Sequence, residues 1–245
     1  MKTAITITAR MKSTRLPLKV VRLINGVPVI EHLVNRLKQS KLANEIILCT
    51  STNPQDEILV DYAQKLKIKH FRGDEDDVLK RIYDGAMENN VDYIVSTTAD
   101  NPLTDPIYAD KILQSFLDGD HDYITINGLP IGTFSYGLKV KAIETVLQKK
   151  KETNTEIWGV YFKDSPVFRR KVIDAEKELY HPEYRLTVDL PEDLEVVRII
   201  YKNLQKNSEI FSLKSVVDFL EVHPEVVSIN KNITQRQATT YTKIN

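Results

Sequence analysis

Cationic side chains gather near the start of the chain, directly after a short apolar run. The stretch ITARMKSTRLPLK, residues 7–19, holds two arginines and two lysines around a serine and a threonine. Arginine offers a bidentate fork to phosphate oxygens, lysine offers a mobile point charge, and hydroxyl groups add donors. The stretch lacks the G-x-x-x-x-G-K-[ST] pattern of a P-loop. It predicts an anion site of another kind, and a basic loop that simply faces water is the alternative.

Two aspartates each come at the end of an apolar run that is typical of a strand. Asp100 follows DYIVSTT (92–98), and Asp189 lies within YRLTVDL (184–190), just before a helix that begins at Pro191. Mg²⁺ binds few carboxylates together with the phosphates of a substrate. The pair opposite a basic loop therefore predicts a metal–phosphate site, although Asp100 alone also fits a turn aspartate bonded to its own backbone.

Other acidic residues near these motifs have local explanations. Asp105 suits a helix N-cap, and Asp193 falls in the first turn of a helix, where an acid favours the macrodipole. In RGDEDDVLKRIYDGA (72–86), an aspartate is expected to cap a helix, and Asp77 and Arg81 have the spacing of an ion pair on one helix face. The functional alternative places this segment beside a nucleotide.

Apolar periodicity predicts the elements that position these residues. Strand-like runs alternate with helical stripes, which is typical of parallel βαβ units in an open, doubly wound sheet. The predicted strands are 3–9, 45–51, 68–71, 92–98 and 122–126, and the predicted helices are 27–43, 54–67, 75–90 and 107–117. Ligands of such sheets lie at the carboxyl ends of the strands. The loops to inspect are therefore 10–19, 51–54, 72–77 and 98–106.

The pattern changes after residue 127. A Gly-rich loop and strand are expected over 128–140, a helix over 141–151, strands over 167–173 and 184–190, helices over 191–205 and 212–224, and a polar tail from Ser228. The stretch TEIWGVYF (155–162) is not assigned. Its aromatic residues are expected in a core or a subunit contact, and Glu156 is a candidate for contact with an acceptor substrate.

Composition limits the classes of protein that the chain can represent. Its 245 residues include 34 Lys and Arg against 34 Asp and Glu, and this zero net charge argues against general nucleic-acid binding. A single cysteine excludes a disulfide framework and a cysteine-based zinc site. Neither a signal peptide nor an apolar run of about 18 to 20 residues is evident. We expect a soluble cytoplasmic protein without a membrane or nucleic-acid partner.

Four motifs together resemble one family. ITARMKSTRLPLKVV is similar to the opening of CMP-sugar-acid synthetases such as 3-deoxy-manno-octulosonate cytidylyltransferase, and more so to that of SpsF-type cytidylyltransferases of spore-coat polysaccharide synthesis. The similarity continues through GDEDDVLKR, ADNPLTDP and RLTVDLPEDLEVV, over about residues 4–205. It implies an α/β, GT-A-like nucleotidyltransferase fold in a single domain, 1–245. An insertion subdomain at about 130–185 would shape the acceptor pocket and form the contact of a homodimer.

The resemblance also implies roles for individual residues. The predicted catalytic residues are Arg15, Lys19, Asp100 and Asp189, of which the two aspartates would bind Mg²⁺. The predicted nucleotide contacts are Ala9, Arg10, Lys12, Ser13, Asp77, Arg81, Thr98 and Ala99. Arg10, Arg15 and Lys19 would hold the triphosphate, because their cations suit its charge.

The implied reaction is attack by an acceptor oxygen on the α-phosphate of CTP, with release of pyrophosphate. The product would be the CMP (or CDP) derivative of a sugar, sugar acid or related acceptor for cell-surface polysaccharide, including lipopolysaccharide or capsule. Two alternatives stay open. One is a GT-A glycosyltransferase, although TTADNP stands where an Asp-x-Asp motif is expected. The other is a non-catalytic nucleotide-binding protein on the same fold.

The chain departs from the family pattern in the basic loop. Lys12 and Leu18 stand where the family usually has glycine, which allows positive φ and close approach of the backbone to phosphate. The conformation of the loop is therefore expected to differ. The glutamine that precedes Gly-Asp in the octulosonate enzymes is also missing, which argues against that particular acceptor.

Overall fold

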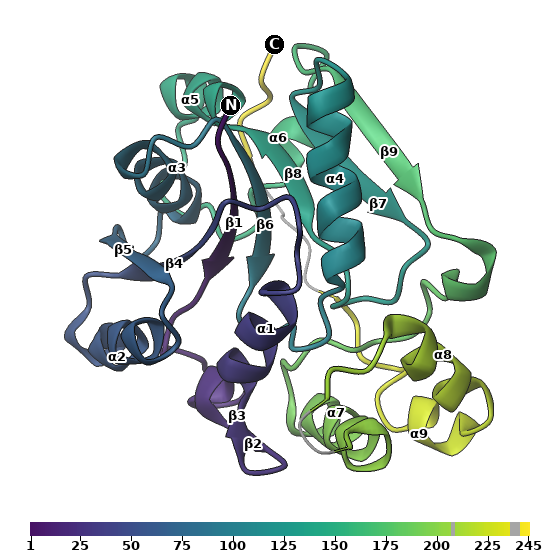
Figure 1. The fold of residues 1–245 in the computed structure, drawn as a ribbon. Helices are drawn as coiled ribbons and strands as arrows, with labels where there is room; N and C mark the ends of the chain where they lie inside the picture. Colours follow the sequence, from purple (N-terminus) through teal and green to yellow (C-terminus); the bar gives the residue numbers. More distant parts are fainter. Residues whose placement is uncertain (207–208, 236–240) are drawn as a thin grey trace.

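A seven-stranded sheet runs through the middle of the protein. The structure, a computed structural model, describes residues 1–206, 209–235 and 241–245. The sheet order is β5-β4-β1-β6-β8-β7-β9 (Figure 1). Its strands are β1 (Thr3–Thr8), β4 (Glu45–Ser51), β5 (Lys69–Gly73), β6 (Tyr93–Thr98), β7 (Tyr123–Asn127), β8 (Tyr136–Lys139) and β9 (Arg170–Asp174). A small hairpin, β2 (Leu23–Ile24) with β3 (Val27–Pro28), lies outside it.

The sheet is mostly parallel. β1 pairs in parallel with β4 and with β6, so that Thr8 stands opposite Cys49 on one side and Thr98 on the other. β4 with β5 and β7 with β9 are also parallel, whereas β8 runs antiparallel to both of its neighbours. The predicted class, an open and mostly parallel sheet, is confirmed.

Helices cover both faces of this sheet. They are α1 (Val29–Leu37), α2 (Glu57–Lys65), α3 (Val78–Glu88), α4 (Pro106–Asp118), α5 (Val140–Lys149), α6 (Val160–Lys163), α7 (Pro191–Leu204), α8 (Leu213–Glu221) and α9 (Pro224–Ser228), with 3-10 turns η1 (Lys19–Val21), η2 (Pro54–Asp56) and η3 (Lys177–Leu179). Successive strand residues point to opposite faces. Ile5 and Ile7 of β1 therefore pack in the core that includes α1 and α4, and Ala4 packs in the core of α3 and α5.

The prediction of a strand at 184–190 is wrong. This segment is extended, but its partners are loop residues, so it forms one isolated bridge between Ile131 and Arg185 instead of a ladder. The amide of Leu186 donates to the Ile131 carbonyl at 2.7 Å, and that of Val188 donates to the Asp100 carbonyl at 2.8 Å. Gly132 permits this approach: it has a φ of 91°, and a Cβ there would lie 2.4 Å from the backbone nitrogen of Thr187.

Segment 130–185, predicted as an insertion subdomain, contributes β8 and β9 to the central sheet. Its aromatic residues form a core in which Trp158 lies edge-on to Tyr136 and Phe162, with ring centroids 5.5 and 6.1 Å apart. The last residues of the chain close this core, because Ile244 is buried in it and its carbonyl accepts from Ser165 Oγ at 2.6 Å. The predicted polar tail from Ser228 includes residues 236–240, which lie outside the described residues.

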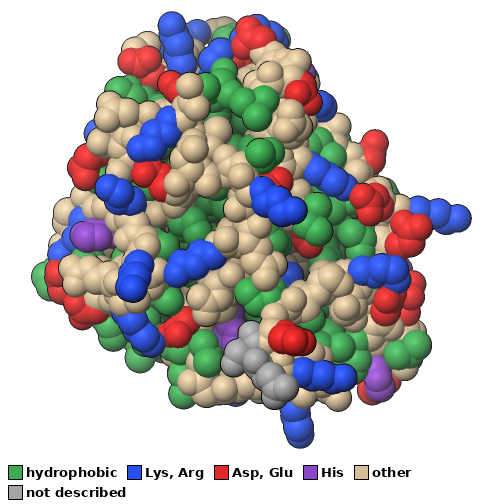
Figure 2. Space-filling model, viewed as in Figure 1, with side chains coloured by type: hydrophobic (Ala, Val, Ile, Leu, Met, Phe, Trp, Pro, Cys, Tyr) green, Lys and Arg blue, Asp and Glu red, His purple; other side chains and the backbone are tan. Residues whose placement is uncertain are grey.

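The surface carries no broad field of one charge on the face that Figure 2 shows. Basic and acidic side chains are interspersed there, in keeping with the equal numbers of each in the sequence. Over the ranges that the structure describes, the helices are all too short or too polar to cross a bilayer.

Candidate active site

A cleft opens at the carboxyl ends of β1 and β6. The chain leaves β1 toward β4 on one side, while β6 lies on the other, so the cleft marks the point where the strand order reverses. Open α/β sheets bind ligands at such switch points. The loop after β1, the end of β6, the start of α3 and the segment 154–158 line it. All predicted site residues except Asp77 and Asp189 are among its lining residues.

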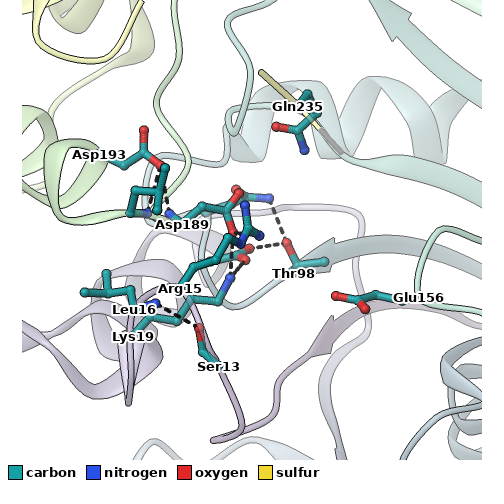
Figure 3. A network of polar contacts seen from close by, with 12 residues as sticks. Ser13, Arg15, Leu16, Lys19, Thr98, Glu156, Asp189, Asp193 and Gln235 are labelled. Carbon is teal, nitrogen blue, oxygen red and sulfur yellow. Dashed lines mark hydrogen bonds and ion pairs between the residues drawn. The ribbon is translucent and has the colours of Figure 1, made fainter. Parts of the chain in front are cut away.

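An ion cluster at the cleft joins residues that are far apart in the sequence (Figure 3). Lys19 Nζ donates to Asp100 Oδ2 and, at 2.8 Å, to Asp189 Oδ1. Arg15 donates to the same Asp189 oxygen at 2.7 Å. Asp100 also accepts from the Thr98 hydroxyl. The structure thus brings the predicted catalytic residues together, with Asp189 behind the two cations that line the cleft.

The charges of this cluster support one another. Burial alone would lower the pKa of Lys19, but Asp100 and Asp189 outweigh burial and raise it above its ordinary value. Burial alone would raise the pKa of Asp189, but Lys19, Arg15 and Arg185 outweigh it and hold that pKa below the usual range. Both groups are therefore charged near neutral pH.

The two aspartates fit a divalent cation. Their carboxylates converge on one point, because a single ammonium nitrogen, Lys19 Nζ, contacts both of them. Within the described ranges, no group of three or more His, Cys, Asp or Glu side chains is placed to hold a metal alone. Two carboxylates suit Mg²⁺, which commonly completes its shell with water and substrate phosphates.

The outer part of the basic loop contacts a different wall of the cleft. Arg10 donates to the Glu75 carbonyl at 2.9 Å and lies 3.6 Å from the Asp76 carboxylate and 3.7 Å from that of Glu156. Lys12 pairs with the Glu75 carboxylate at 3.2 Å. Figure 3 shows Glu156 across the site from Asp189. These contacts hold the loop between the end of β1 and the start of α3.

The loop itself is fixed by short-range contacts. Buried Asp56 accepts the Met11 amide at 2.7 Å, and Ser13 Oγ accepts the Leu16 amide at 3.3 Å. Leu18 has left-handed backbone angles, φ 59° and ψ 27°, whereas Lys12 is not among the residues with positive φ. Of the two positions where the family pattern has glycine, Leu18 is therefore the one whose backbone favours it.

Asp77 is not among the residues that line the cleft, although Asp76 and Val78 on either side of it are. It is the N-cap of α3, accepting the Lys80 amide at 3.2 Å, and its other oxygen pairs with Lys150 Nζ at 2.6 Å. The expected pairing with Arg81 is wrong: Arg81 does line the cleft, but it donates to the Asp74 carbonyl at 2.6 Å. The capping requirement of the helix and a nearby lysine turn the Asp77 side chain away.

Sequence reasoning missed several side chains of the site. Asp76 and Asn154 line the cleft, and Trp158, expected only in a core or a subunit contact, lines it as well. Arg185 contacts Asp189 at 3.0 Å from a buried position. Of these residues, only Arg185 could have been found from the sequence. A carboxylate at the end of an apolar run, such as Asp189, requires a partner when it is buried, and Arg185 lies four residues before it.

Known proteins share this fold over nearly their whole length. A cytidylyltransferase from Leptospira borgpetersenii superimposes with a TM-score of 0.86 at 24% identity, covering 97% of this chain and 100% of that one. A CMP:2-keto-3-deoxy-manno-octonic acid synthetase complexed with CTP gives 0.66 at 17% identity, covering 84% and 100%. The fold is that of nucleotidyltransferases.

Sequence comparison gives the family. Residues 4–233 match the profile of the family described as cytidylyltransferase. The chain is 31% identical to the uncharacterized protein MJ1063 of Methanocaldococcus jannaschii over 94% of this chain and 95% of that one. It is 28% identical to the spore coat polysaccharide biosynthesis protein SpsF of Bacillus subtilis over 91% and 95%. The protein belongs to the cytidylyltransferase family of enzymes.

Proposed function

We propose that this protein is a Mg²⁺-dependent enzyme that transfers the cytidylyl group of CTP to a sugar-like acceptor and releases pyrophosphate. The observation that carries the proposal is the cluster of Lys19 and Arg15 with Asp100 and Asp189 at the switch point of the sheet. It combines carboxylates for a hard cation with cations for a triphosphate.

The reaction requires positioning and charge neutralisation more than a covalent nucleophile. The acceptor oxygen forms a bond to the α-phosphorus, and the bond to the bridging oxygen breaks, with its electron pair leaving on pyrophosphate. Arg15 and Lys19 lie where they can turn from Asp189 to the phosphates and balance that charge. A bound Mg²⁺ would act as a Lewis acid for the same charge and would be held by Asp100 and Asp189.

The outer cations are suited to a supporting role. Arg10 and Lys12 line the cleft and are held by the 75–76 loop, so they can bind the outer phosphates without reaching the deep cluster. The Thr98 and Ala99 positions lie at the end of β6, where a nucleoside would meet the sheet edge.

The relatives support a cell-surface sugar as the acceptor. One is named for spore coat polysaccharide biosynthesis, and a structure of the same fold is a synthetase of a CMP-linked sugar acid with bound CTP. We propose an acceptor of the sugar or sugar-acid class on this basis, and a cytoplasmic homodimer as the working form. Light scattering of the purified protein would measure the oligomeric state.

A pyrophosphate-release screen tests the activity. The protein would be incubated with CTP, Mg²⁺ and sets of sugar acids, sugar phosphates and phosphonates. We expect release with one acceptor class, and loss of that release on chelation of Mg²⁺ with EDTA. Release that persists in EDTA would contradict the metal requirement, and release with UTP or ATP in place of CTP would contradict the nucleotide assignment.

A further inference from the structure

The two carboxylate oxygens of Asp189 have separate partners. Oδ1 accepts from Arg15 at 2.7 Å and from Lys19 at 2.8 Å, on the side of the cleft. Oδ2 accepts from the guanidinium of Arg185 at 3.0 Å, on the buried side. One oxygen is thus held by the interior, and the other is presented to the cations of the cleft.

Arg185 is itself fixed by a second aspartate. Its Nε donates to Asp193 Oδ1 at 2.9 Å, and the same terminal nitrogen that holds Asp189 donates to Asp193 Oδ2 at 3.1 Å. Asp193 Oδ2 also accepts the backbone amides of Asp189 and Leu190, at 3.0 and 3.1 Å. Asp193 is fully buried and Arg185 is 4% exposed. The planar fork of arginine matches this bidentate geometry, which a lysine cannot reproduce.

Two residues near the C-terminus complete the arrangement. Asn230 Nδ2 donates both to the Arg185 carbonyl and to Asp193 Oδ1, each at 2.9 Å. Gln235 Oε1 accepts from the remaining terminal nitrogen of Arg185 at 2.5 Å. Every nitrogen of the guanidinium therefore has an acceptor, and the whole group is held in one orientation.

The backbone around Asp189 explains why such support is needed. The segment 184–190 has no ladder of its own, so regular strand pairing does not fix the direction of the Asp189 side chain. Asp100 differs, since it follows β6 and is oriented by the neighbouring Thr98 hydroxyl. Asp189 depends instead on side-chain contacts from behind.

We propose that Arg185 is a positioning residue for the proposed metal site: it orients the Asp189 carboxylate so that one oxygen faces the cation position. This role rests on the proposed function. Residues that hydrogen-bond a metal-ligating side chain from behind commonly change metal affinity about 10- to 100-fold when replaced. The role therefore predicts an effect on metal binding that is separate from any effect on stability.

Electron paramagnetic resonance of Mn²⁺ with saturating CTP tests the proposal on the full-length protein. Arg185→Lys keeps the charge but loses the fork, and we expect Mn²⁺ to bind about tenfold more weakly or worse. CTP binding without metal should be little changed. The matched control is Arg36→Lys, because Arg36 is 3% exposed, donates to the Thr104 and Phe211 carbonyls, and does not line the cleft. Its Mn²⁺ affinity should equal that of the unmodified protein.

The outcomes separate the proposal from the function on which it rests. Unmodified protein that binds no Mn²⁺ with CTP would overturn the proposed function, and the role of Arg185 with it. If the unmodified protein binds Mn²⁺ and Arg185→Lys binds it with equal affinity, the role of Arg185 is overturned and the proposed function is not. An equal loss of Mn²⁺ affinity in Arg185→Lys and Arg36→Lys would have the same meaning.

If Arg185→Lys does not fold, Gln235→Ala replaces it. Removing that exposed acceptor should weaken Mn²⁺ binding by less than replacement of Arg185 itself, because Gln235 contacts Arg185 and not Asp189, and no change would overturn the role.

Discussion

The basic loop after β1 carries two pairs of cations with different surroundings. The inner pair, Arg15 and Lys19, contacts the aspartates at the ends of distant segments, and the Lys19 side chain is only 15% exposed. The outer pair, Arg10 and Lys12, contacts the 75–76 loop, and the Lys12 side chain is 62% exposed. The sequence presents these four residues as one patch, but the fold divides them.

The difference in burial between the two lysines indicates a difference in energy. The arginines do not repeat it, because the Arg15 side chain is 29% exposed and that of Arg10 is 18% exposed. Charges in a buried cluster interact more strongly than exposed ones, where water and salt screen them. Exposed ion pairs contribute between about 0 and 1 kcal/mol. Lys19 should therefore contribute strongly to turnover, and Lys12 should make a modest contribution to nucleotide affinity.

The largest expected effect is on turnover, and it should differ between the two lysines of this loop. Lys19→Met should lower kcat/KM by about 10²- to 10³-fold, because in its proposed role this cation would balance the charge that develops on the phosphates. The matched variant Lys12→Met should lower it less than about fivefold, as expected for an exposed charge. Pyrophosphate-release kinetics would measure both. Equal losses in the two variants would remove the distinction between inner and outer pairs.

Replacing the aspartates should separate catalysis from stability. Asp100→Asn and Asp189→Asn should both severely reduce Mg²⁺-dependent turnover. Asp189→Asn should also lower the free energy of unfolding by about 3 kcal/mol, because it breaks a buried network with three cations. Asp100→Asn should lower it less, because Asp100 pairs with one cation, Lys19, and is more exposed than Asp189, at 16% against 7%.

Urea unfolding of each aspartate variant, alongside kinetics, provides the comparison. Unchanged turnover in Asp100→Asn would remove its metal role. Equal stability losses would show that the two carboxylates are not held differently.

A stabilising substitution should be available beside the inner pair. Leu18 has left-handed backbone angles that cost a residue with a Cβ about 1 to 2 kcal/mol. Leu18→Gly should relieve this cost and raise the free energy of unfolding by about 1 kcal/mol, after allowance for the greater freedom of glycine in the unfolded chain. Leu23→Gly is the matched control: both leucines are 50% exposed, but Leu23 lies in a strand and has no positive φ, so its replacement should destabilise.

The smallest expected effect is a pH dependence of the free energy of unfolding that arises at His32. The buried side chain of His32 donates from Nε2 to the carbonyl of Ile24 at 2.9 Å. Burial lowers the pKa of His32 below its ordinary value of 6.5. The unfolded chain then binds the proton more readily, so stability is constant above about pH 6.5 and falls as the pH drops below it. Between pH 6.5 and 5.5 the loss is at most about 1 kcal/mol.

The variant His32→Gln keeps a donor to Ile24 and removes the titration. Its free energy of unfolding should vary less between pH 7.5 and 5.5 than that of the unmodified protein, as measured by urea unfolding. The same slope in both proteins would assign the pH dependence to other groups.

The sequence predicted the layers of the fold because periodicity is a local property. The strands and helices predicted in the first 127 residues all formed, and most of their ends shifted by three residues or fewer. The helix predicted over 27–43 is shorter, Val29–Leu37, and the hairpin of β2 and β3 was not predicted. The prediction of a strand at 184–190 failed because its backbone amides donate to the loop carbonyls of Ile131 and Asp100 instead of to a strand, which no local pattern reveals.

The site was predictable to the extent that strand ends meet at one edge of a sheet. That rule placed Lys19 near Asp100, at a sequence separation of 81 residues. It did not indicate that Asp77 would turn toward Lys150, nor that Arg185 would lie behind Asp189, because those contacts depend on side-chain direction. The left-handed backbone at Leu18 was suggested only by comparison with the family pattern.

Calorimetric titration of the unmodified protein with nucleotides tests the central claim most directly. CTP, ATP, GTP and UTP would each be titrated with and without Mg²⁺ at fixed ionic strength. If the cluster of Arg15, Lys19, Asp100 and Asp189 is a metal-dependent site for CTP, as proposed, CTP should bind most tightly of the four nucleotides. Mg²⁺ should also strengthen the binding of CTP. Equal affinity for all four nucleotides, or CTP binding that does not change with Mg²⁺, would contradict the account.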